Sequence, residues 1–212
     1  MKIEDWGHIE YESSVAKQLA LLECVHEGSS DETLVFCSHP AVVTLGRGSV
    51  PEDTAEWKGS IYQSSRGGRA TYHGPNQLVA YPILDLKRAH RGFKQRDVHA
   101  YLRALESATV AVIREIGLVS AEARTSKAGE ISLTGVWVGE KKVASLGIAV
   151  RKWITYHGVA INVTEDPSAF AGIRPCGFAS SVMSSLEHEL GRAIDKADFL
   201  EICKRVFLSA LS

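Results

Sequence analysis

The sequence predicts a single α/β domain, residues 1–212, in which helices flank a mixed, largely antiparallel sheet. Three observations lead to this prediction. Short β-rich runs and amphipathic helical stretches are interspersed along the chain, turn signals typical of hairpins separate neighbouring runs, and no long linker or low-complexity stretch divides it. Hydrophobic residues make up 45% and charged residues 23% of the chain, which is ordinary for a folded domain and excludes a disordered one.

The N-terminal part of the chain contains predicted strands and one predicted helix. Runs of apolar, β-branched and aromatic residues predict strands at 3–9, 33–38, 41–45 and 78–86. Apolar residues at helical spacing predict an amphipathic helix over 12–27, which Gly28 ends. His39-Pro40 is a turn signal between two of the strands, and a polar loop is predicted from 46 to 59.

The C-terminal part is predicted to contain a long helix, a hairpin and two further helices. Asp97 is of the residue type that caps helix N-termini, and the helix that follows it ends at Gly117. Gly139-Glu140 suits the two-residue turn of a hairpin over 135–150. The other predicted segments are a polar loop at 121–134, a strand at 153–163, a Pro/Gly-containing loop at 167–181, and helices at 182–190 and 195–209.

Charge and cysteine usage exclude several classes of protein. Lys plus Arg is 24 and Asp plus Glu is 25, so the net charge is −1, whereas a nucleic-acid binder normally shows a basic excess. The four cysteines lie far apart, which disfavours a disulfide framework or a cysteine-rich zinc site. The N-terminus lacks the apolar segment of a secretory signal, and no apolar run approaches the length of a membrane span. We therefore expect a soluble, cytoplasmic, reduced protein without a metal site.

Cys176 differs from the other cysteines, which are predicted to be small buried residues of helices and a strand. It lies in Gly-Ile-Arg-Pro-Cys-Gly, where Pro175 restricts the backbone before it and Gly177 permits a tight turn after it. Such a loop can direct backbone N–H groups towards an oxyanion, and Arg174 would favour the nucleophilic thiolate. The local pattern leaves two interpretations open: a structural turn or a nucleophile.

A nucleophilic cysteine needs a nearby base or cation, and the sequence offers His73, His157 and Lys142. Both histidines lie in the tetrapeptide Thr-Tyr-His-Gly, at 71–74 and 155–158, which predicts that both segments line one pocket. Lys142 follows the hairpin turn and shares strand parity with Ala144, Leu146 and Ile148, an unusual place for an ammonium group. The alternatives are histidines satisfied beside turns and a lysine that extends to the edge of the hairpin.

Two further segments stand out. Residues 66–77 are rich in glycine and hydrogen-bond donors but match neither dinucleotide nor P-loop patterns. The basic run 87–96 is typical of a solvated loop, and its alternative is a contact surface for an acidic protein partner.

Four blocks of the chain together resemble the lipoyl(octanoyl) transferases, the lipoate-protein ligase B family. The blocks are RGGRATYHGPNQ at 66–77, GVWVGEKKVASLGIAV at 135–150, YHGVAINV at 156–163 and IRPCGF at 173–178. The resemblance implies the α/β fold shared with lipoate and biotin protein ligases. It also places the acyl-thioester nucleophile at Cys176 and a lysine that stabilises its thiolate at Lys142.

The resemblance further implies an acyl-chain pocket built from three segments. Its residues are Arg66, Gly67, Gly68, Arg69, Ala70, Thr71, Tyr72, His73, Ser145, Leu146, Gly147, Gly158, Val159 and Ala160. The small residues among them are expected to leave a tunnel for a medium acyl chain. This chain departs from the family at Arg69, where glutamine is common, and at Asn76, where glycine is common. The role of Arg69 is therefore open.

The implied reaction transfers an octanoyl (or lipoyl) group from acyl carrier protein to the ε-amino group of a lysine on a lipoyl domain. The donor carries the acyl group on phosphopantetheine, so no separate cofactor, ATP or metal is expected. The implied acceptors are lipoyl domains of 2-oxoacid dehydrogenase subunits and the glycine cleavage H protein. No nucleic acid or membrane partner is expected, and a monomer is the default oligomeric state.

Three alternatives remain at this level. An ATP-dependent lipoate ligase would form an acyl-adenylate and tolerate loss of Cys176. A non-catalytic module would bind carrier or lipoyl domains through the basic loop and form no covalent adduct. A cysteine hydrolase using Cys176 and His157 would release free octanoate.

Overall fold

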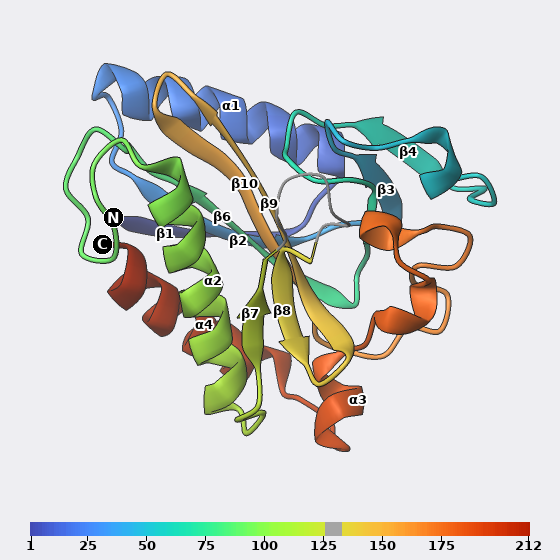
Figure 1. Cartoon of the computed structure of the whole chain (residues 1–212). Helices are drawn as coiled ribbons and strands as arrows, with labels where there is room; N and C mark the ends of the chain where they lie inside the picture. The colour runs from blue at the N-terminus through green and yellow to red at the C-terminus, as the bar shows by residue number, and fades with distance from the viewer. Residues whose placement is uncertain (126–132) are drawn as a thin grey trace.

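A seven-stranded sheet runs through the centre of the computed structural model, which describes residues 1–125 and 133–212 (Figure 1). The strands are β1 (Lys2–His8), β2 (Thr33–Ser38), β3 (Val42–Leu45), β4 (Ser60–Gln63), β5 (Thr71–His73), β6 (Gln77–Ile83), β7 (Glu122–Arg124), β8 (Gly135–Val138), β9 (Lys141–Arg151) and β10 (Ile154–Asn162). The helices are α1 (Tyr11–Glu27), α2 (Val98–Glu115), α3 (Leu186–Leu190) and α4 (Lys196–Leu211), with 3₁₀ turns η1 (Pro51–Asp53), η2 (Pro175–Gly177) and η3 (Ser180–Val182).

The order of strands in the main sheet is β1-β2-β6-β10-β9-β8-β7. Strands β1 and β2 are parallel, and every other neighbouring pair in this sheet is antiparallel. The prediction of a mixed, largely antiparallel sheet flanked by helices is confirmed.

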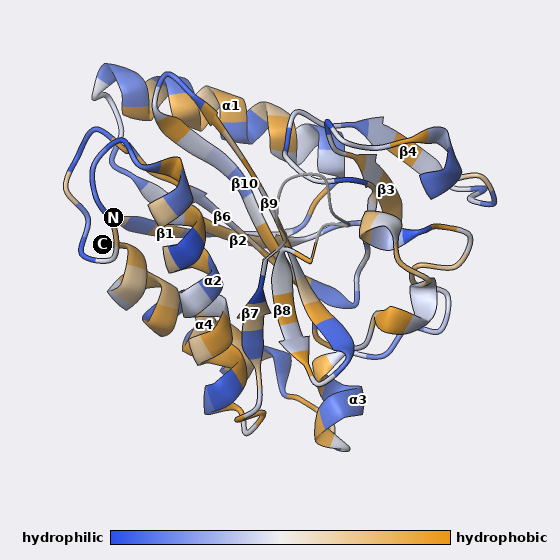
Figure 2. Ribbon diagram, in the orientation of Figure 1, coloured by the Kyte–Doolittle hydropathy of each residue, from blue (hydrophilic) through white to orange (hydrophobic). Residues whose placement is uncertain are grey.

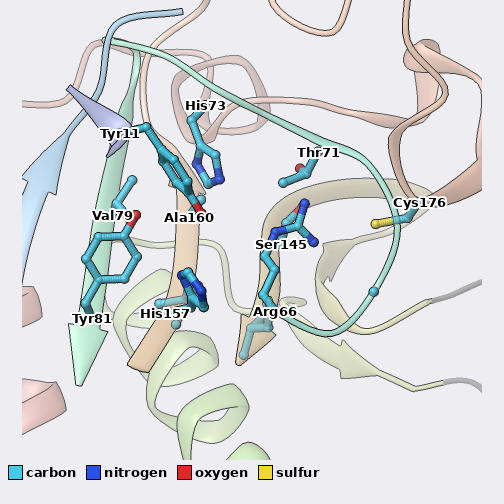
Figure 3. Close-up of a pocket in the computed structure, with 15 residues that line it drawn as sticks. Tyr11, Arg66, Thr71, His73, Val79, Tyr81, Ser145, His157, Ala160 and Cys176 are labelled. Carbon is cyan, nitrogen blue, oxygen red and sulfur yellow. The ribbon is translucent and has the colours of Figure 1, made fainter. Parts of the chain in front are cut away.

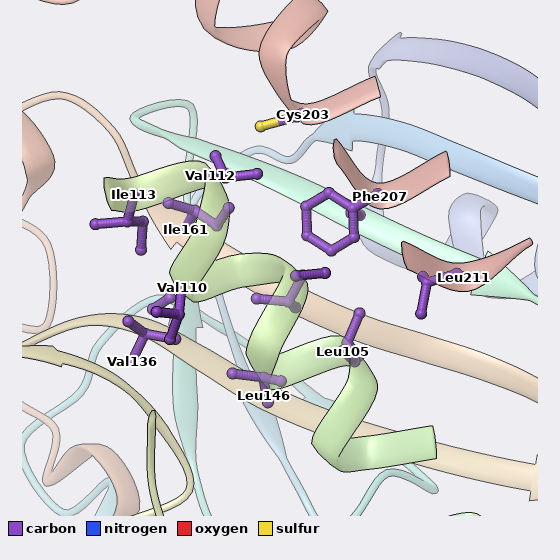
Figure 4. Close-up of a cluster of buried hydrophobic side chains, with 14 of the residues drawn as sticks. Leu105, Val110, Val112, Ile113, Val136, Leu146, Ile161, Cys203, Phe207 and Leu211 are labelled. Atoms are coloured by element: carbon purple, nitrogen blue, oxygen red, sulfur yellow. The ribbon is translucent and has the colours of Figure 1, made fainter. Parts of the chain in front are cut away.

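Helices cover both faces of the main sheet, and strand alternation decides which side chains meet which helix. In β2, Leu34 and Phe36 pack in the cluster that includes residues of α2 and α4, whereas Val35 and Cys37 pack in the cluster that includes residues of α1. Figure 4 shows the first cluster, in which Leu105 of α2 and Phe207 of α4 converge on the sheet. Because both faces are covered, β2 is buried at all but its last residue.

The ends of the two longest helices follow local signals in the sequence. The Asp97 carboxylate accepts a hydrogen bond from Ala100 N at 2.8 Å, so it is the N-cap of α2. Gly28 adopts φ 77° after the last residue of α1, and its N–H donates to the carbonyls of Cys24 and Val25. Both predicted boundaries are confirmed. No helix of the described residues is sufficiently long and apolar to span a bilayer.

A second sheet, with the order β4-β3-β5, lies at the other end of the molecule from the N- and C-termini (Figure 1). It packs against the loop that follows β10, and its small apolar cluster contains Val43, Tyr72, Phe170 and Ile173. Its strands have only three or four residues, so loops make up most of this end.

Three predicted boundaries are wrong. The strand expected at 78–86 is β6, which ends at Ile83. The helix expected at 182–190 begins only at Leu186, because Ser185 caps it by accepting a hydrogen bond from His188 N at 3.2 Å. The loop expected at 121–134 contains β7, which pairs with β8, and its residues 126–132 lie outside the described residues.

Candidate active site

A small cavity lies on the α1 face of the main sheet, beside the second sheet. Its walls come from β5, β6, β9 and β10, from the start of α1 and from the loops that carry Arg66 and Cys176. Figure 3 shows Cys176, Thr71 and Ser145 towards one side of this cavity and Tyr11, Tyr81 and His157 towards the other. The lining residues are Tyr11, Arg66, Gly68, Thr71, His73, Val79, Tyr81, Ser145, Leu146, Gly147, His157, Gly158, Val159, Ala160 and Cys176.

Most of the residues expected to bind the acyl chain line this cavity. Those that do are Arg66, Gly68, Thr71, His73, Ser145, Leu146, Gly147, Gly158, Val159 and Ala160. Gly67, Arg69, Ala70 and Tyr72 do not line it. Three lining residues were not predicted from the sequence: Tyr11, Val79 and Tyr81. Val79 and Tyr81 could have been found, because residues two apart on a strand lie on the same face, here the α1 face.

The glycines of the cavity wall make room for the protein's own atoms. A Cβ at Gly158 would lie 2.1 Å from the carbonyl oxygen of Ala80 on the neighbouring strand. A Cβ at Gly147 would lie 3.0 Å from Cδ of Arg66, whose side chain crosses the strand there. These two glycines therefore admit close backbone and side-chain packing, whereas the sequence predicted that their small size would leave an open tunnel.

Cys176 is buried and has a left-handed backbone conformation, with φ 55° and ψ 19°. This conformation is unfavourable for a residue with a Cβ, and such residues gather at functional sites. The turn is held by hydrogen bonds from Cys176 N to Ala70 O at 3.0 Å, from Gly177 N to Arg174 O at 2.9 Å and from Phe178 N to Pro175 O at 3.0 Å. Because all three N–H groups are engaged, the prediction that they hold an oxyanion is wrong for this conformation.

Lys142 reaches the cysteine from β9. Its side chain is fully buried, and its Nζ lies 3.6 Å from Cys176 Sγ and 5.7 Å from the centre of the Trp137 ring. No salt bridge joins Lys142 to any carboxylate of the described residues. The Cys176 sulfur is the hydrogen-bond partner that the described structure gives to Lys142 Nζ.

A β-bulge in β9 turns Lys142 towards Cys176. The prediction that Lys142 lies on the same face of the strand as Ala144, Leu146 and Ile148 is therefore wrong. Val136 pairs with Ala144 but Trp137 pairs with Lys142, so Val143 is left without a partner in β8. Lys142 therefore faces the side of Ser145 and Gly147, not the side of Ala144, Leu146 and Ile148. Gly135 provides the space, because a Cβ there would lie 2.4 Å from Cε of Lys142.

The prediction that both Thr-Tyr-His-Gly segments line one pocket is confirmed, since His73 and His157 both line the cavity. Burial lowers the pKa of His157 to about 3, with a further contribution from the Arg66 charge. Burial likewise lowers the pKa of His73 well below its ordinary value. No hydrogen bond given by the described structure joins either ring to Cys176; His157 Nε2 lies 3.2 Å from Ser65 Oγ instead. The two histidines are neutral wall residues here.

Arg66 is a buried cation in the wall between the cavity and β3. Its Nη2 donates to Thr44 O at 2.6 Å and to Thr44 Oγ1 at 2.7 Å, and its Nη1 donates to Gly67 O at 3.0 Å. Burial lowers the pKa of its guanidinium below the ordinary value for arginine. Arg66 thereby ties the glycine-rich segment to the second sheet.

The basic run 87–96 lies far from this cavity. Arg91 N donates to the carbonyl of Ser212 at 2.8 Å, so the loop is tied to the C-terminus. Figure 2 shows this hydrophilic loop beside the termini, at the opposite end of the molecule from the second sheet. Its position does not favour a role in presenting a partner to Cys176.

Comparisons with known proteins agree with the sequence blocks. Residues 10–208 match the family described as "Lipoyl protein ligase A/B catalytic domain". A protein named Octanoyltransferase from Bdellovibrio bacteriovorus is 46% identical over 213 residues, covering 98% of this chain and 97% of that protein. Another of the same name from Geobacter metallireducens is 40% identical, covering 93% of this chain and 87% of the relative.

Solved structures share the fold at low sequence identity. A bi-partite lipoate protein ligase from Thermoplasma acidophilum matches with a TM-score of 0.57 at 18% identity, covering 99% of this chain and 81% of that chain. Biotin protein ligase from Aquifex aeolicus matches with a TM-score of 0.53 at 12% identity, covering 99% of this chain and 68% of that chain. At these identities the likeness shows the fold alone, and it confirms the biotin/lipoate protein ligase-like fold.

Proposed function

The chain belongs to the lipoyl protein ligase A/B catalytic domain family, and we propose that it transfers an octanoyl group through a thioester on Cys176. Relatives named Octanoyltransferase make it an acyltransferase that carries out octanoyl transfer in protein lipoylation. The observation that supports the chemical route is the buried contact of 3.6 Å between Lys142 Nζ and Cys176 Sγ beside the cavity. The ATP-dependent ligase alternative is not favoured by these relatives.

In the first half-reaction the Cys176 thiolate attacks the carbonyl carbon of the octanoyl thioester on acyl carrier protein. A carbon–sulfur bond to Cys176 forms and the bond to the phosphopantetheine sulfur breaks. The Lys142 ammonium stabilises the attacking thiolate and gives its proton to the leaving thiol. The octanoyl chain then lies in the cavity that the acyl-binding segments line.

In the second half-reaction the acceptor lysine attacks the acyl-enzyme as a neutral amine. Neutral Lys142 takes the proton that this amine releases as the amide bond forms, and Cys176 leaves as a thiolate. The ammonium and the thiolate are thereby regenerated, so one catalytic cycle consumes no further proton. Thioester to thioester is nearly balanced in energy, and thioester to amide is favourable, so the route needs no ATP or metal and no cofactor of its own.

The carbonyl oxygen of the bound thioester needs hydrogen-bond donors other than the engaged N–H groups of the Cys176 turn. The Thr71 hydroxyl lines the cavity, is buried, and has no hydrogen-bond partner among the described residues. Together with the Lys142 ammonium, it is the donor that we assign to the developing negative charge.

We propose octanoyl-acyl carrier protein as the donor, and lipoyl domains of 2-oxoacid dehydrogenase subunits and the glycine cleavage H protein as acceptors. The cytoplasm is the proposed compartment, supported by four free cysteines, which suit a reducing environment. A monomer is the proposed oligomeric state.

Intact-protein mass spectrometry with octanoyl-acyl carrier protein tests the proposal. Wild type is expected to gain one octanoyl group that hydroxylamine removes, and Cys176→Ala is expected to gain none. Cys24→Ala is the matched control, because Cys24 lies outside the cavity and is an exposed thiol, which corrects the prediction that it is buried. Absence of the wild-type adduct in folded protein, or its persistence in Cys176→Ala, would contradict the route.

A further inference from the structure

Two loops converge on the turn that carries Cys176. The loop after β3 contributes η1, where the carbonyl oxygen of Asp53 accepts a hydrogen bond from Arg174 N at 2.8 Å. The glycine-rich segment contributes Ala70, whose carbonyl accepts from Cys176 N at 3.0 Å. The turn is thus bound on one side by the Asp53 backbone and on the other by the residue that follows Arg69.

The side chains of Asp53 and Arg69 connect these two supporting loops directly. The Asp53 side chain is fully buried and accepts hydrogen bonds from Val50 N at 3.1 Å and from Arg69 Nε at 3.1 Å. Its second oxygen accepts from Arg69 Nη2, so the ion pair is bidentate. The Arg69 side chain remains 27% exposed, so water can solvate part of its charge. The buried Asp53 carboxylate has no such solvation and therefore depends more on the ion pair.

The same guanidinium lies against the turn itself. A Cβ at Gly177 would lie 2.3 Å from Nη1 and 3.0 Å from Cζ of Arg69. Gly177 has φ 88° and directly follows the left-handed Cys176. Arg69 therefore fills the space beside the nucleophile's turn while Asp53 fixes the orientation of the guanidinium.

We propose that the Asp53–Arg69 ion pair is a clamp that holds the strained Cys176 turn, and that Arg69 is a positioning residue. This inference rests on the proposed function, because it assigns a role in presenting the sulfur for acyl transfer. A glutamine in place of Arg69 would leave the buried Asp53 carboxylate without a cation, so the arginine and the aspartate act as a unit.

Arg69→Gln, Asp53→Asn and the double variant test the clamp in the full-length chain. The rate of Cys176 alkylation by iodoacetamide and the kcat and KM of octanoyl transfer are measured well below the unfolding temperature. Arg69→Gln is expected to lower both the alkylation rate and kcat about tenfold, with KM unchanged, since a displaced sulfur reacts more slowly. The double variant, with two neutral groups that can hydrogen-bond, is expected to return to within about threefold of wild type.

Arg69→Lys provides a second variant in case Arg69→Gln does not fold, because it keeps the charge but loses the bidentate fork; its expected loss is about threefold. Arg103→Gln is the matched control: Arg103 pairs with the buried Glu106 on α2, away from the cavity. Arg103→Gln is expected to lower the free energy of unfolding while leaving the rate of Cys176 alkylation unchanged. If Arg69 had only a structural role, its variants would show this same combination.

The outcomes separate the two proposals. If Arg69→Gln and Arg69→Lys react like wild type in both assays, the clamp is wrong. If the double variant is as slow as Arg69→Gln, Arg69 acts without Asp53 and the clamp is also wrong. If wild type forms no acyl-enzyme, the proposed function fails, and the alkylation series still decides whether the ion pair positions Cys176.

Discussion

The two ends of the molecule are stabilised by different interactions. Where α2 and α4 pack on the main sheet, the side chains of Leu105, Val112, Phe207 and Leu211 are fully buried in one apolar cluster (Figure 4). Around Cys176 the buried groups include two cations, a carboxylate and two histidines. Apolar packing tolerates changes that conserve volume, whereas a polar network depends on each partner.

This difference predicts that substitutions at the two ends will separate catalysis from stability. Substitutions at the α2–α4 end are expected to change the free energy of unfolding and to leave the rate of octanoyl transfer unchanged. Around Cys176 the chemistry changes and the free energy of unfolding changes less. Four predictions follow, from the largest effect to the smallest, and the first three test this separation.

Lys142→Ala is expected to lower octanoyl transfer about thousandfold, because the proton donor and the charge beside the thiolate are both lost. The free energy of unfolding is expected to change much less than the transfer rate, because the substitution removes a costly buried ammonium group and the Cys176 sulfur that remains can take a proton and become neutral. Single-turnover transfer and urea unfolding measure the two quantities. Lys141→Ala is the matched control, because Lys141 is the exposed neighbour whose Nζ donates to Ser181 O at 2.7 Å. Near-normal transfer by Lys142→Ala would remove Lys142 from the mechanism.

Leu105→Ala is expected to lower the free energy of unfolding by about 3 kcal/mol, because it leaves a cavity in a fully buried apolar cluster. Transfer per folded molecule is expected to match wild type at a temperature where the variant is folded. Val119→Ala serves as the control, because Val119 is 77% exposed and its truncation removes little packing. A large loss of transfer in folded Leu105→Ala would show that the two ends are coupled.

Gly135→Ala is expected to lower transfer about tenfold, since the added methyl group displaces the Lys142 side chain by an ångström or less. The methyl carbon would lie 2.4 Å from both Lys142 Cε and Ala144 O. Gly139→Asn in the same hairpin is the control, because a Cβ there meets no atom within 4 Å and asparagine tolerates its φ of 55°. Equal rates for the two variants would contradict the role of Gly135 in seating Lys142.

The stability of the protein is expected to fall as the pH drops from about 6.5 towards 4. Burial lowers the pKa of His39 to about 4, so between these values the unfolded chain binds a proton that the folded chain does not. The folded ring is neutral, with its Nδ1–H donating to Ile9 O and its Nε2 accepting from Tyr81 Oη, each at 2.8 Å. Between pH 7.5 and 5.5, the free energy of unfolding of His39→Gln is expected to fall by about 1 kcal/mol less than that of wild type, as measured by urea unfolding. Equal losses would show that His39 does not contribute.

Sequence reasoning was most successful where one local rule decides the structure. The Asp97 cap, the Gly28 terminus and the hairpin at Gly139-Glu140 each depend on a few neighbouring residues. Continuous runs of apolar and β-rich residues likewise predicted most strands of the main sheet, because both of its faces are buried.

Sequence reasoning was less successful around Cys176, where distant segments determine each other's geometry. The oxyanion prediction failed because Ala70, over a hundred positions earlier, takes up the Cys176 N–H. The prediction that Lys142 lies on the same face of β9 as Ala144 was wrong, because the unpaired residue Val143 forms a bulge that places Lys142 on the opposite face. The contact of Arg69 with Asp53 depends on a loop whose path no periodicity specifies.

The bulge at Val143 limits how the hairpin can vary in length during evolution. One residue inserted or deleted between Lys142 and Ser145 would turn the ammonium group towards the helices and away from the sulfur. Insertions at the exposed Gly139-Glu140 turn would leave this facing intact. Related chains that keep the cysteine–lysine pair are therefore expected to differ in length at the tip of the hairpin. They are expected to keep the same number of residues between the positions of Lys142 and Ser145.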